Sequence, residues 1–249
     1  MTPHGRYVLR LADTNLVLAQ RLGEWVGRAP ALEEDLGLAN VSLDLLGQAR
    51  LLLAHAGQLE GRGRDEDALA FLREESEFYN LTLVEQPNGD FGDTIVRQFL
   101  FDAWQLGMYE ALRGSTDATL AAVAAKGRGE AAYHLRYSAG WLVRLGDGTL
   151  ESHARVTDSL ARLWPLTREL FDDDDVDRAA AEAGIGVLPS TLEPAFAARV
   201  DRTLGDATLA RPAVAWFNWY GKQGRHSEHL GYLLAEMQSL HRAHPGATW

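Results

Sequence analysis

No cysteine occurs among the 249 residues of the chain. This absence excludes disulfides, thiolate metal sites, cysteine-held iron–sulfur clusters and cysteine nucleophiles. A chain without disulfides fits a reducing compartment. The opening residues, MTPHGRYVLRLADTN, show no apolar core after a basic start, so we expect no signal peptide.

Long apolar runs and positive charge are also scarce. No stretch reaches the roughly 18 to 20 continuous apolar residues of a membrane helix. The 24 Lys and Arg stand against 35 Asp and Glu, which gives a formal net charge of −11. Such a chain is repelled by nucleic-acid phosphates and is poorly suited to anionic membrane surfaces. We expect a soluble, cytoplasmic protein that binds neither nucleic acid nor membrane.

Alternating β-branched runs joined by hairpin turns are absent, and apolar residues recur at helical spacing instead. The pattern predicts four long helices, at 5–27, 31–60, 93–113 and 118–145. Further helices are predicted at 68–83, at 151–171, after a capping box at 190–193, and at 221–243. Without a repeat or a long linker, the chain is predicted to be one all-α domain over residues 1–249. We expect a ferritin-like helical bundle with additional C-terminal helices.

The helix predicted at 31–60 carries many leucines. Its acidic residues 33–35 lie near the N-terminus, where the helix dipole favours negative charge. The stripe expected to face the core consists of Leu36, Ala39, Leu43, Leu46, Arg50 and Leu53.

Ferritin-like carboxylate proteins bind two metal ions with one Glu from each of two helices and Glu-x-x-His from each of the other two. Residues three apart share a helix face, so both ligands reach the same metal pair. No Glu-x-x-His occurs in the four long helices. Asp44 is followed three residues later by Gly47, which cannot ligate, and Glu130 is followed three residues later by Tyr133.

Polar residues nonetheless fall on or beside the predicted inward faces, namely Asp44, Asp102, Glu130 and His134. Buried carboxylates are costly unless they are paired or bound to metal. We interpret the four residues as the remnant of a metal site that is now filled by hydrogen bonds, with no catalytic residue and no cofactor. A working metal site built from them, and ordinary polar contacts without metal ancestry, are the alternatives.

Two C-terminal features have more than one interpretation. His226 and His229 are three residues apart, which can begin a metal site, but no third or fourth ligand is evident nearby. A helix N-terminus or a contact between subunits fits them better. The aromatic cluster at 216–220 suits an interface as well as a core.

Several segments resemble the PaaC-type family of the multicomponent phenylacetyl-CoA 1,2-epoxidases, which supplies their C subunit. They are RLGEW at 21–25, LDLLGQAR at 43–50, LVEQPNG at 83–89, YHLR at 133–136 and HSEHLG at 226–231. The likeness spans essentially the whole chain, and several matches of four to eight residues are more specific than one motif.

The resemblance implies a ferritin-like fold and a place in aerobic phenylacetate degradation. In such systems the A subunit holds the di-iron centre that activates oxygen, and the complex forms a ring epoxide on phenylacetyl-CoA. The C subunit supports the A subunit without a complete metal site of its own. The system also contains a B subunit and a reductase E subunit. The resemblance assigns no catalytic residue to this chain.

Three functions therefore compete. The leading one is a non-catalytic structural subunit of an oxygenase complex, which is expected to pair with itself when isolated. The second is an independent carboxylate-bridged di-metal oxidoreductase that uses Asp44, Asp102, Glu130 and His134. The third is an acyl-CoA-binding helical module, with Lys222 and Arg225 as the positive charge for the phosphates.

Overall fold

The computed structural model describes residues 1–213 and 220–247. The chain divides into two compact units, the first formed by Met1–Pro87 with Trp219–Trp249 and the second by Asn88–Asn218. The prediction that residues 1–249 form a single domain is not tested by this division and stays a prediction.

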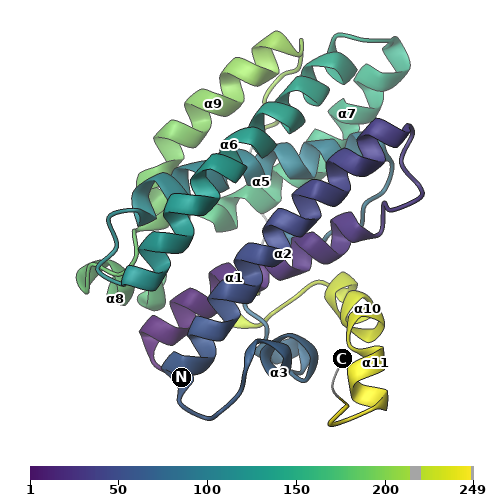
Figure 1. Ribbon diagram of the computed structural model, residues 1–249. Helices are drawn as coiled ribbons and strands as arrows, with labels where there is room; N and C mark the ends of the chain where they lie inside the picture. The colour runs from purple at the N-terminus through teal and green to yellow at the C-terminus, as the bar shows by residue number, and fades with distance from the viewer. Residues whose placement is uncertain (214–219, 248–249) are drawn as a thin grey trace. The chain divides into compact units, whose positions relative to one another are not determined.

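The first unit is built around a long antiparallel helix pair, α1 (Pro3–Gly23) and α2 (Leu32–Glu60), which lie side by side (Figure 1). The short helices α3 (Glu66–Phe71) and α4 (Thr82–Glu85) follow in sequence. The C-terminal helices α10 (Glu228–Met237) and α11 (Ser239–Ala243) complete the unit. Two 3-10 turns, Glu75–Glu77 and Gly221–Gln223, lie between these elements.

The second unit repeats this plan with the pair α5 (Phe91–Leu112) and α6 (Ala118–Gly146). Helices α7 (Leu150–Leu163) and α9 (Glu193–Asp206) pack on α5, and α8 (Asp175–Glu182) precedes α9. The segments Trp164–Phe171 and Pro189–Leu192 are 3-10 helices. No β-strand occurs in the residues that the structure describes, so the all-α prediction is confirmed. Paired long helices of this kind are the components of a ferritin-like fold.

Three of the four long helices, α1, α5 and α6, begin where side chains satisfy the free N–H groups of a helix start, whereas α2 begins after Ala31 without a side-chain cap. Thr2 Oγ1 accepts from the Gly5 N–H of α1 at 3.2 Å. Asp90 and Asp93 form a reciprocal capping box on α5, and the Asp117 carboxylate accepts from the first turn of α6. These local signals explain why the predicted bounds of α1, α5 and α6 are close to the observed ones.

The helix predicted at 68–83 is wrong, because α3 ends at Phe71 and α4 begins only at Thr82. Tertiary hydrogen bonds hold the intervening chain in a non-helical path. Asp13 Oδ2 accepts from the Tyr79 N–H at 2.9 Å, and Thr14 Oγ1 accepts from the Leu81 N–H at 3.2 Å. Both acceptors come from α1, so a local periodicity could not reveal them.

Three other predicted helices also differ from the structure. The one at 151–171 is α-helical only to Leu163, and the one at 221–243 is divided into a 3-10 turn, α10 and α11. The predicted capping box at 190–193 does not form. Ser190 instead bonds Asp173, with its hydroxyl 2.6 Å from the carboxylate, and α9 begins after Leu192 without a side-chain cap.

The face of α2 that was predicted to be buried is largely exposed. Leu36 is 58% exposed, Leu43 64% and Leu46 39%, although Leu53 is buried. The buried face consists of Leu38, Val41, Leu45, Ala49, Leu52, Leu53 and Ala56. Leucines lie on both sides of this helix, so the spacing of apolar residues could not decide which side faces the unit.

Candidate functional site

The second unit contains a buried polar cluster between α5 and α6. Asp102 is fully buried, and its two carboxylate oxygens accept hydrogen bonds from Gln98 Nε2 at 2.6 Å and from Ser138 Oγ at 2.7 Å. His134, one turn before Ser138 on α6, is also buried and interacts electrostatically with Asp102. Gln98 and Asp102 are four residues apart on α5, and His134 and Ser138 are four apart on α6, so the geometry follows from helical spacing.

Burial raises the pKa of Asp102 to about 6, because removal from water disfavours the carboxylate. The nearby His134 and the hydrogen bonds from Ser138 and Gln98 oppose this shift without cancelling it. Asp102 therefore takes up a proton in the folded protein at a higher pH than in the unfolded chain.

Replacing Asp102 by asparagine is expected to change how stability depends on pH. The folded pKa of about 6 lies above the ordinary value of 3.8, so the stabilising effect of the proton is complete below the unfolded pKa and is lost as pH rises through 6. Between pH 4.5 and 7.5 the wild type should lose about 2 kcal/mol of unfolding free energy more than Asp102→Asn. Urea denaturation of both proteins across this range measures the difference. Parallel pH profiles would contradict the assignment.

The other sequence-predicted site residues lie elsewhere. Glu130 is half-buried and pairs with Lys126 Nζ at 3.8 Å across one turn of α6, and its side chain is 22% exposed. Tyr133, at the position where a ligand would follow Glu130, is 48% exposed. Asp44 belongs to the first unit, where it is half-buried on α2. Of the four predicted residues, the structure brings Asp102 and His134 together within the second unit.

The residues that surround Asp102 do not fit a carboxylate-bridged metal pair. A carboxylate-bridged metal pair needs several Glu and His ligands, whereas the groups that hydrogen-bond to the two oxygens of Asp102 are the amide of Gln98 and the hydroxyl of Ser138. Neither donor, Gln98 nor Ser138, was predicted from the sequence. Their spacing of four from Asp102 and His134 was the available signal, but glutamine and serine are not metal ligands in this pattern.

The equivalent helix pair of the first unit carries amides. Asn15 of α1 donates to Gln48 of α2 through Nδ2 and Oε1 at 3.3 Å, and both residues are buried. Gln48 lies one turn after Asp44 on α2. Neutral amides satisfy each other without a cation, so this pair also suits a hydrogen-bonded core better than a metal site.

The first unit contains a second buried polar cluster, which was not predicted from the sequence. Arg73 forms a two-pronged ion pair with Asp13, and both side chains are fully buried. Arg73 also donates to the Glu77 carbonyl at 2.8 Å. Burial raises the pKa of Asp13, and the Arg73 guanidinium opposes that shift.

Glu85 extends this cluster to the C-terminal segment. Its carboxylate accepts from the Ser227 N–H at 2.6 Å and from Asn80 Nδ2 at 3.0 Å, and it lies 2.9 Å from His226 Nδ1. The other ring nitrogen of His226 lies 2.9 Å from the Phe78 carbonyl, which can only accept a hydrogen bond. His226 therefore donates from Nε2 to Phe78, and its Nδ1 lies within hydrogen-bond distance of Glu85.

This geometry decides between the interpretations of His226 and His229. Both ring nitrogens of His226 are engaged, and α10 begins at Glu228 directly after it. The histidines accordingly mark a helix N-terminus rather than the start of a metal site. The aromatic residues 216–219 lie outside the described residues, whereas Tyr220 is half-buried.

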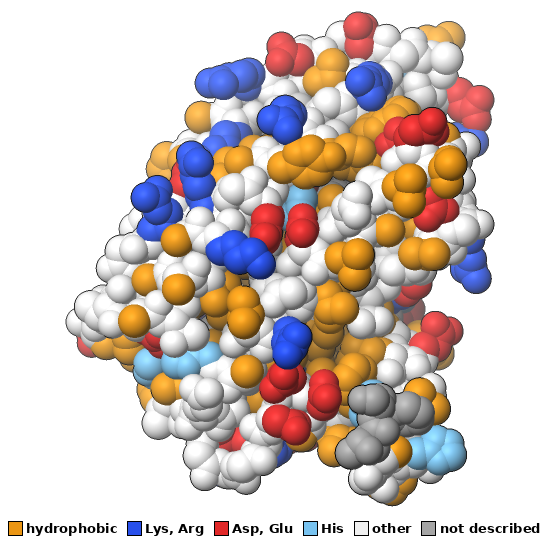
Figure 2. Space-filling view, viewed as in Figure 1, with side chains coloured by type: hydrophobic (Ala, Val, Ile, Leu, Met, Phe, Trp, Pro, Cys, Tyr) orange, Lys and Arg blue, Asp and Glu red, His pale blue; other side chains and the backbone are white. Residues whose placement is uncertain are grey.

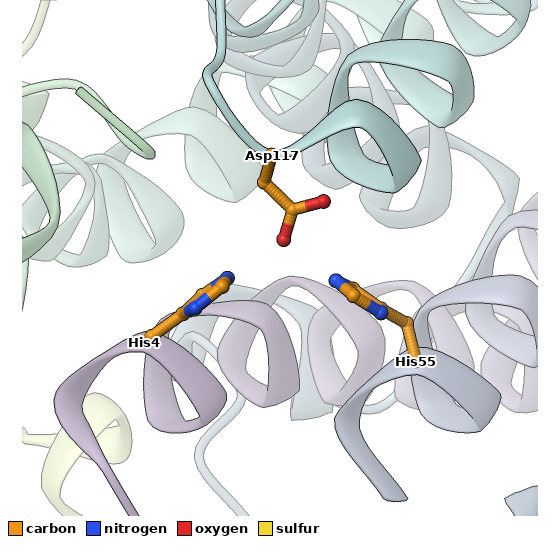
Figure 3. A group of neighbouring side chains, drawn as sticks. All are labelled: His4, His55 and Asp117. Atoms are coloured by element: carbon orange, nitrogen blue, oxygen red, sulfur yellow. The ribbon is translucent and has the colours of Figure 1, made fainter. Parts of the chain in front are cut away.

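Two further polar positions lie in the first unit. His4 of α1 and His55 of α2 face each other edge to face, with ring centroids 6.0 Å apart (Figure 3). Lys222 is 8% exposed, which leaves little of it for the phosphates of an acyl-CoA.

The complete chain, residues 1–249, matches the sequence model of the phenylacetic acid catabolic protein family. The chain therefore belongs to this family. A curated relative is the C subunit of 1,2-phenylacetyl-CoA epoxidase from Escherichia coli (strain K12). It is 54% identical to this chain over 243 residues, which cover 98% of each protein. The resemblance inferred from short segments is confirmed.

Membership of the phenylacetic acid catabolic family gives the buried clusters a context. The relative is named as a subunit, so it acts with other chains. By length and composition alone, α2 is apolar enough to cross a membrane, but a helix in a protein core meets the same criteria.

Proposed function

We propose that this chain is a non-catalytic structural subunit of a multicomponent phenylacetyl-CoA epoxidase that acts in aerobic phenylacetate degradation. It supports the catalytic A subunit, which holds the di-iron centre, and works beside a B subunit and a reductase E subunit in the cytoplasm. One observation carries the non-catalytic role. Asp102, a predicted ligand position, accepts hydrogen bonds from the amide of Gln98 and the hydroxyl of Ser138, and neither residue type belongs to the Glu and His ligand set of a carboxylate-bridged metal pair.

The relative supports the assignment to the complex, because the C subunit of the Escherichia coli epoxidase aligns along essentially its whole length. The missing Glu-x-x-His pattern supports the non-catalytic role independently. When isolated, the chain is proposed to pair with itself through a surface that, in the complex, lies against the A subunit.

Metal content of the purified protein tests this proposal. Plasma mass spectrometry should find far less than one iron per chain when this protein is purified alone, and iron should appear when it is purified with an A-type subunit. Substitution of Asp102 by asparagine should leave the iron content of the complex unchanged. About two iron or manganese ions per lone chain would instead favour the independent di-metal oxidoreductase.

Binding of phenylacetyl-CoA to the lone chain addresses the acyl-CoA alternative. The mostly buried Lys222 argues against it. Calorimetry should therefore detect no heat of binding at micromolar protein, whereas a saturable signal lost in Arg225→Ala would favour the binding module.

A further inference from the structure

We propose that the first unit binds a phosphate group, either free or as the end of a phosphomonoester, in a pocket formed by α1, the end of α2 and the segment that precedes α4. This site is separate from the proposed function and does not depend on it. The name arginine pocket is used for this cavity of about 160 Å³. Its charged lining consists of Arg6, Arg62, Arg64, Arg73, Glu60 and Glu77.

The arginine pocket carries an excess of positive charge, although the chain as a whole has a net charge of −11. Its four arginines face two glutamates, and Asp13 offsets the charge of Arg73. The pKa of the Glu60 carboxyl is lowered by the hydrogen bond from Arg64 and by the charges of Arg64 and Arg62, although burial opposes the shift. On the face of the molecule in Figure 2, acidic and basic side chains are interspersed instead. A concave site with one prevailing sign of charge attracts ions of the opposite sign.

Two of the four guanidinium groups in the arginine pocket have no acidic partner. Arg73 and Arg64 are each held by a carboxylate, whereas Arg6 and Arg62 form no ion pair with any residue that the structure describes. Arg64 also keeps one nitrogen available, because its Nη1 lies 4.0 Å from Glu77 Oε1, which is too far for a hydrogen bond. Three arginines can therefore donate to an anion in this pocket.

Arg6 is held in place without using its N–H groups. Its guanidinium carbon lies 4.0 Å from the centre of the Tyr79 ring. Stacking on an aromatic ring fixes the plane of a guanidinium, while the N–H groups point outward along its edges. The ring is itself anchored, because the Tyr79 N–H donates to Asp13. A donor that is already fixed loses little conformational freedom when an anion binds.

A loop with two glycines places the other two donors. Gly61 and Gly63 have φ angles of +69° and +74°, a region that favours glycine. Gly57, in the last turn of α2, has no room for a side chain, since a Cβ would lie 2.2 Å from the Arg64 carbonyl oxygen. The loop therefore folds back against the end of α2, and Arg62 and Arg64 line the same pocket.

A phosphate dianion suits the arginine pocket better than a carboxylate does. A guanidinium fork matches a pair of phosphate oxygens, and a tetrahedral group can accept from arginines that approach from different sides. The cavity is smaller than the roughly 300 Å³ or more of pockets that enclose a drug-sized ligand. It holds one phosphate group with a few waters, so any larger part of the ligand must extend into solvent.

Titration of the ¹⁵N-labelled full chain with inorganic phosphate, followed by amide NMR at constant ionic strength, tests the proposal. Amides of the loop that carries Arg62 and Arg64 should shift saturably, with a dissociation constant of about 1 mM. A site this weak gives no measurable heat at micromolar protein. Sodium acetate should bind at least about 10-fold more weakly. Glycerol phosphate distinguishes the two sources, because binding as tight as that of inorganic phosphate indicates a phosphomonoester and weaker binding indicates free phosphate.

Two substitutions locate the site. Arg6→Gln should weaken phosphate binding about 10-fold, because it removes a charged donor. Arg62→Gln, at a more exposed position, should weaken it about threefold. Arg28→Gln is the matched control, since it removes the same charge from an exposed arginine between α1 and α2, and it should change binding by less than about 1.5-fold. Thermal melting checks the fold, and Arg62→Gln keeps the test valid if loss of the stacking on Tyr79 unfolds Arg6→Gln.

The outcomes decide between a built site and an adventitious ion only. Saturable binding that both pocket variants weaken, and that Arg28→Gln leaves unchanged, supports the proposal. The proposal is wrong if the shifts do not saturate below about 20 mM phosphate, or if they lie away from the loop. It is also wrong if acetate binds equally well, or if Arg6→Gln and Arg62→Gln bind as the wild type does. None of these measurements involves another subunit, so the proposed function is tested separately.

Discussion

Asp13→Ala is expected to lower the free energy of unfolding of the first unit by about 3–5 kcal/mol, because it leaves a buried guanidinium without its counter-charge. Arg73 donates to Asp13 through both terminal nitrogens, and neither side chain reaches solvent. The Tyr79 N–H, 2.9 Å from Asp13 Oδ2, would lose its acceptor as well. A buried donor without a partner adds about 1–3 kcal/mol.

Urea denaturation, together with amide hydrogen exchange of α1, measures the effect of Asp13→Ala. Exchange is needed because a chain with two units does not guarantee a two-state transition. Asp67→Ala, at an exposed carboxylate of α3, is the control and should change stability by less than about 0.5 kcal/mol. The double variant Asp13→Leu with Arg73→Met should recover part of the loss, since it removes both charges. A loss below about 1 kcal/mol in Asp13→Ala would show that Arg73 finds other partners.

Glu85→Ala is expected to release the C-terminal segment from the rest of the first unit, at a cost of about 2–4 kcal/mol. The Ser227 N–H, Asn80 Nδ2 and His226 Nδ1 all converge on this one carboxylate. Its removal takes a buried acceptor away from all three groups. Amides of α10 should then exchange at least about 30-fold faster, which corresponds to about 2 kcal/mol of local opening.

Glu85→Gln is the matched variant, because it keeps the shape of the side chain and one acceptor oxygen while it turns the other oxygen into a donor. Its effect should lie between those of the wild type and Glu85→Ala. Exchange within α5 of the second unit provides the internal reference and should not change. Wild-type protection of α10 in Glu85→Ala would mean that other contacts, such as Gln238 Nε2 to the Ala70 carbonyl, hold the segment.

The long helices could be predicted from sequence because their signals are local. The apolar spacing of α1, α5 and α6 and the capping aspartates at 90 and 117 are readable within a few residues. The segment between Phe71 and Thr82 was missed for the opposite reason. Its path depends on Asp13 and Thr14, more than 60 residues earlier in the chain.

The candidate site was predictable in part. Asp102 and His134 were identified because a carboxylate and an imidazole on inward helix faces are conspicuous. Gln98 and Ser138 were not, although they decide the chemistry of Asp102. The buried side of α2 was assigned wrongly, since leucines on both faces carry no information about which face meets the core.

The division of the first unit between the two ends of the chain has a consequence during translation. Ser227, which donates to Glu85, is 142 residues further along the chain, so Glu85 leaves the ribosome long before Ser227 and the neighbouring His226 exist. At about 5–20 residues per second, this delay is roughly 7–28 s. During this delay, the nascent chain exposes the carboxylate of Glu85, which is buried in the folded protein, together with the apolar face that α10 later covers. The second unit is continuous in sequence and can be complete by then, so in the cell the half made first is finished last.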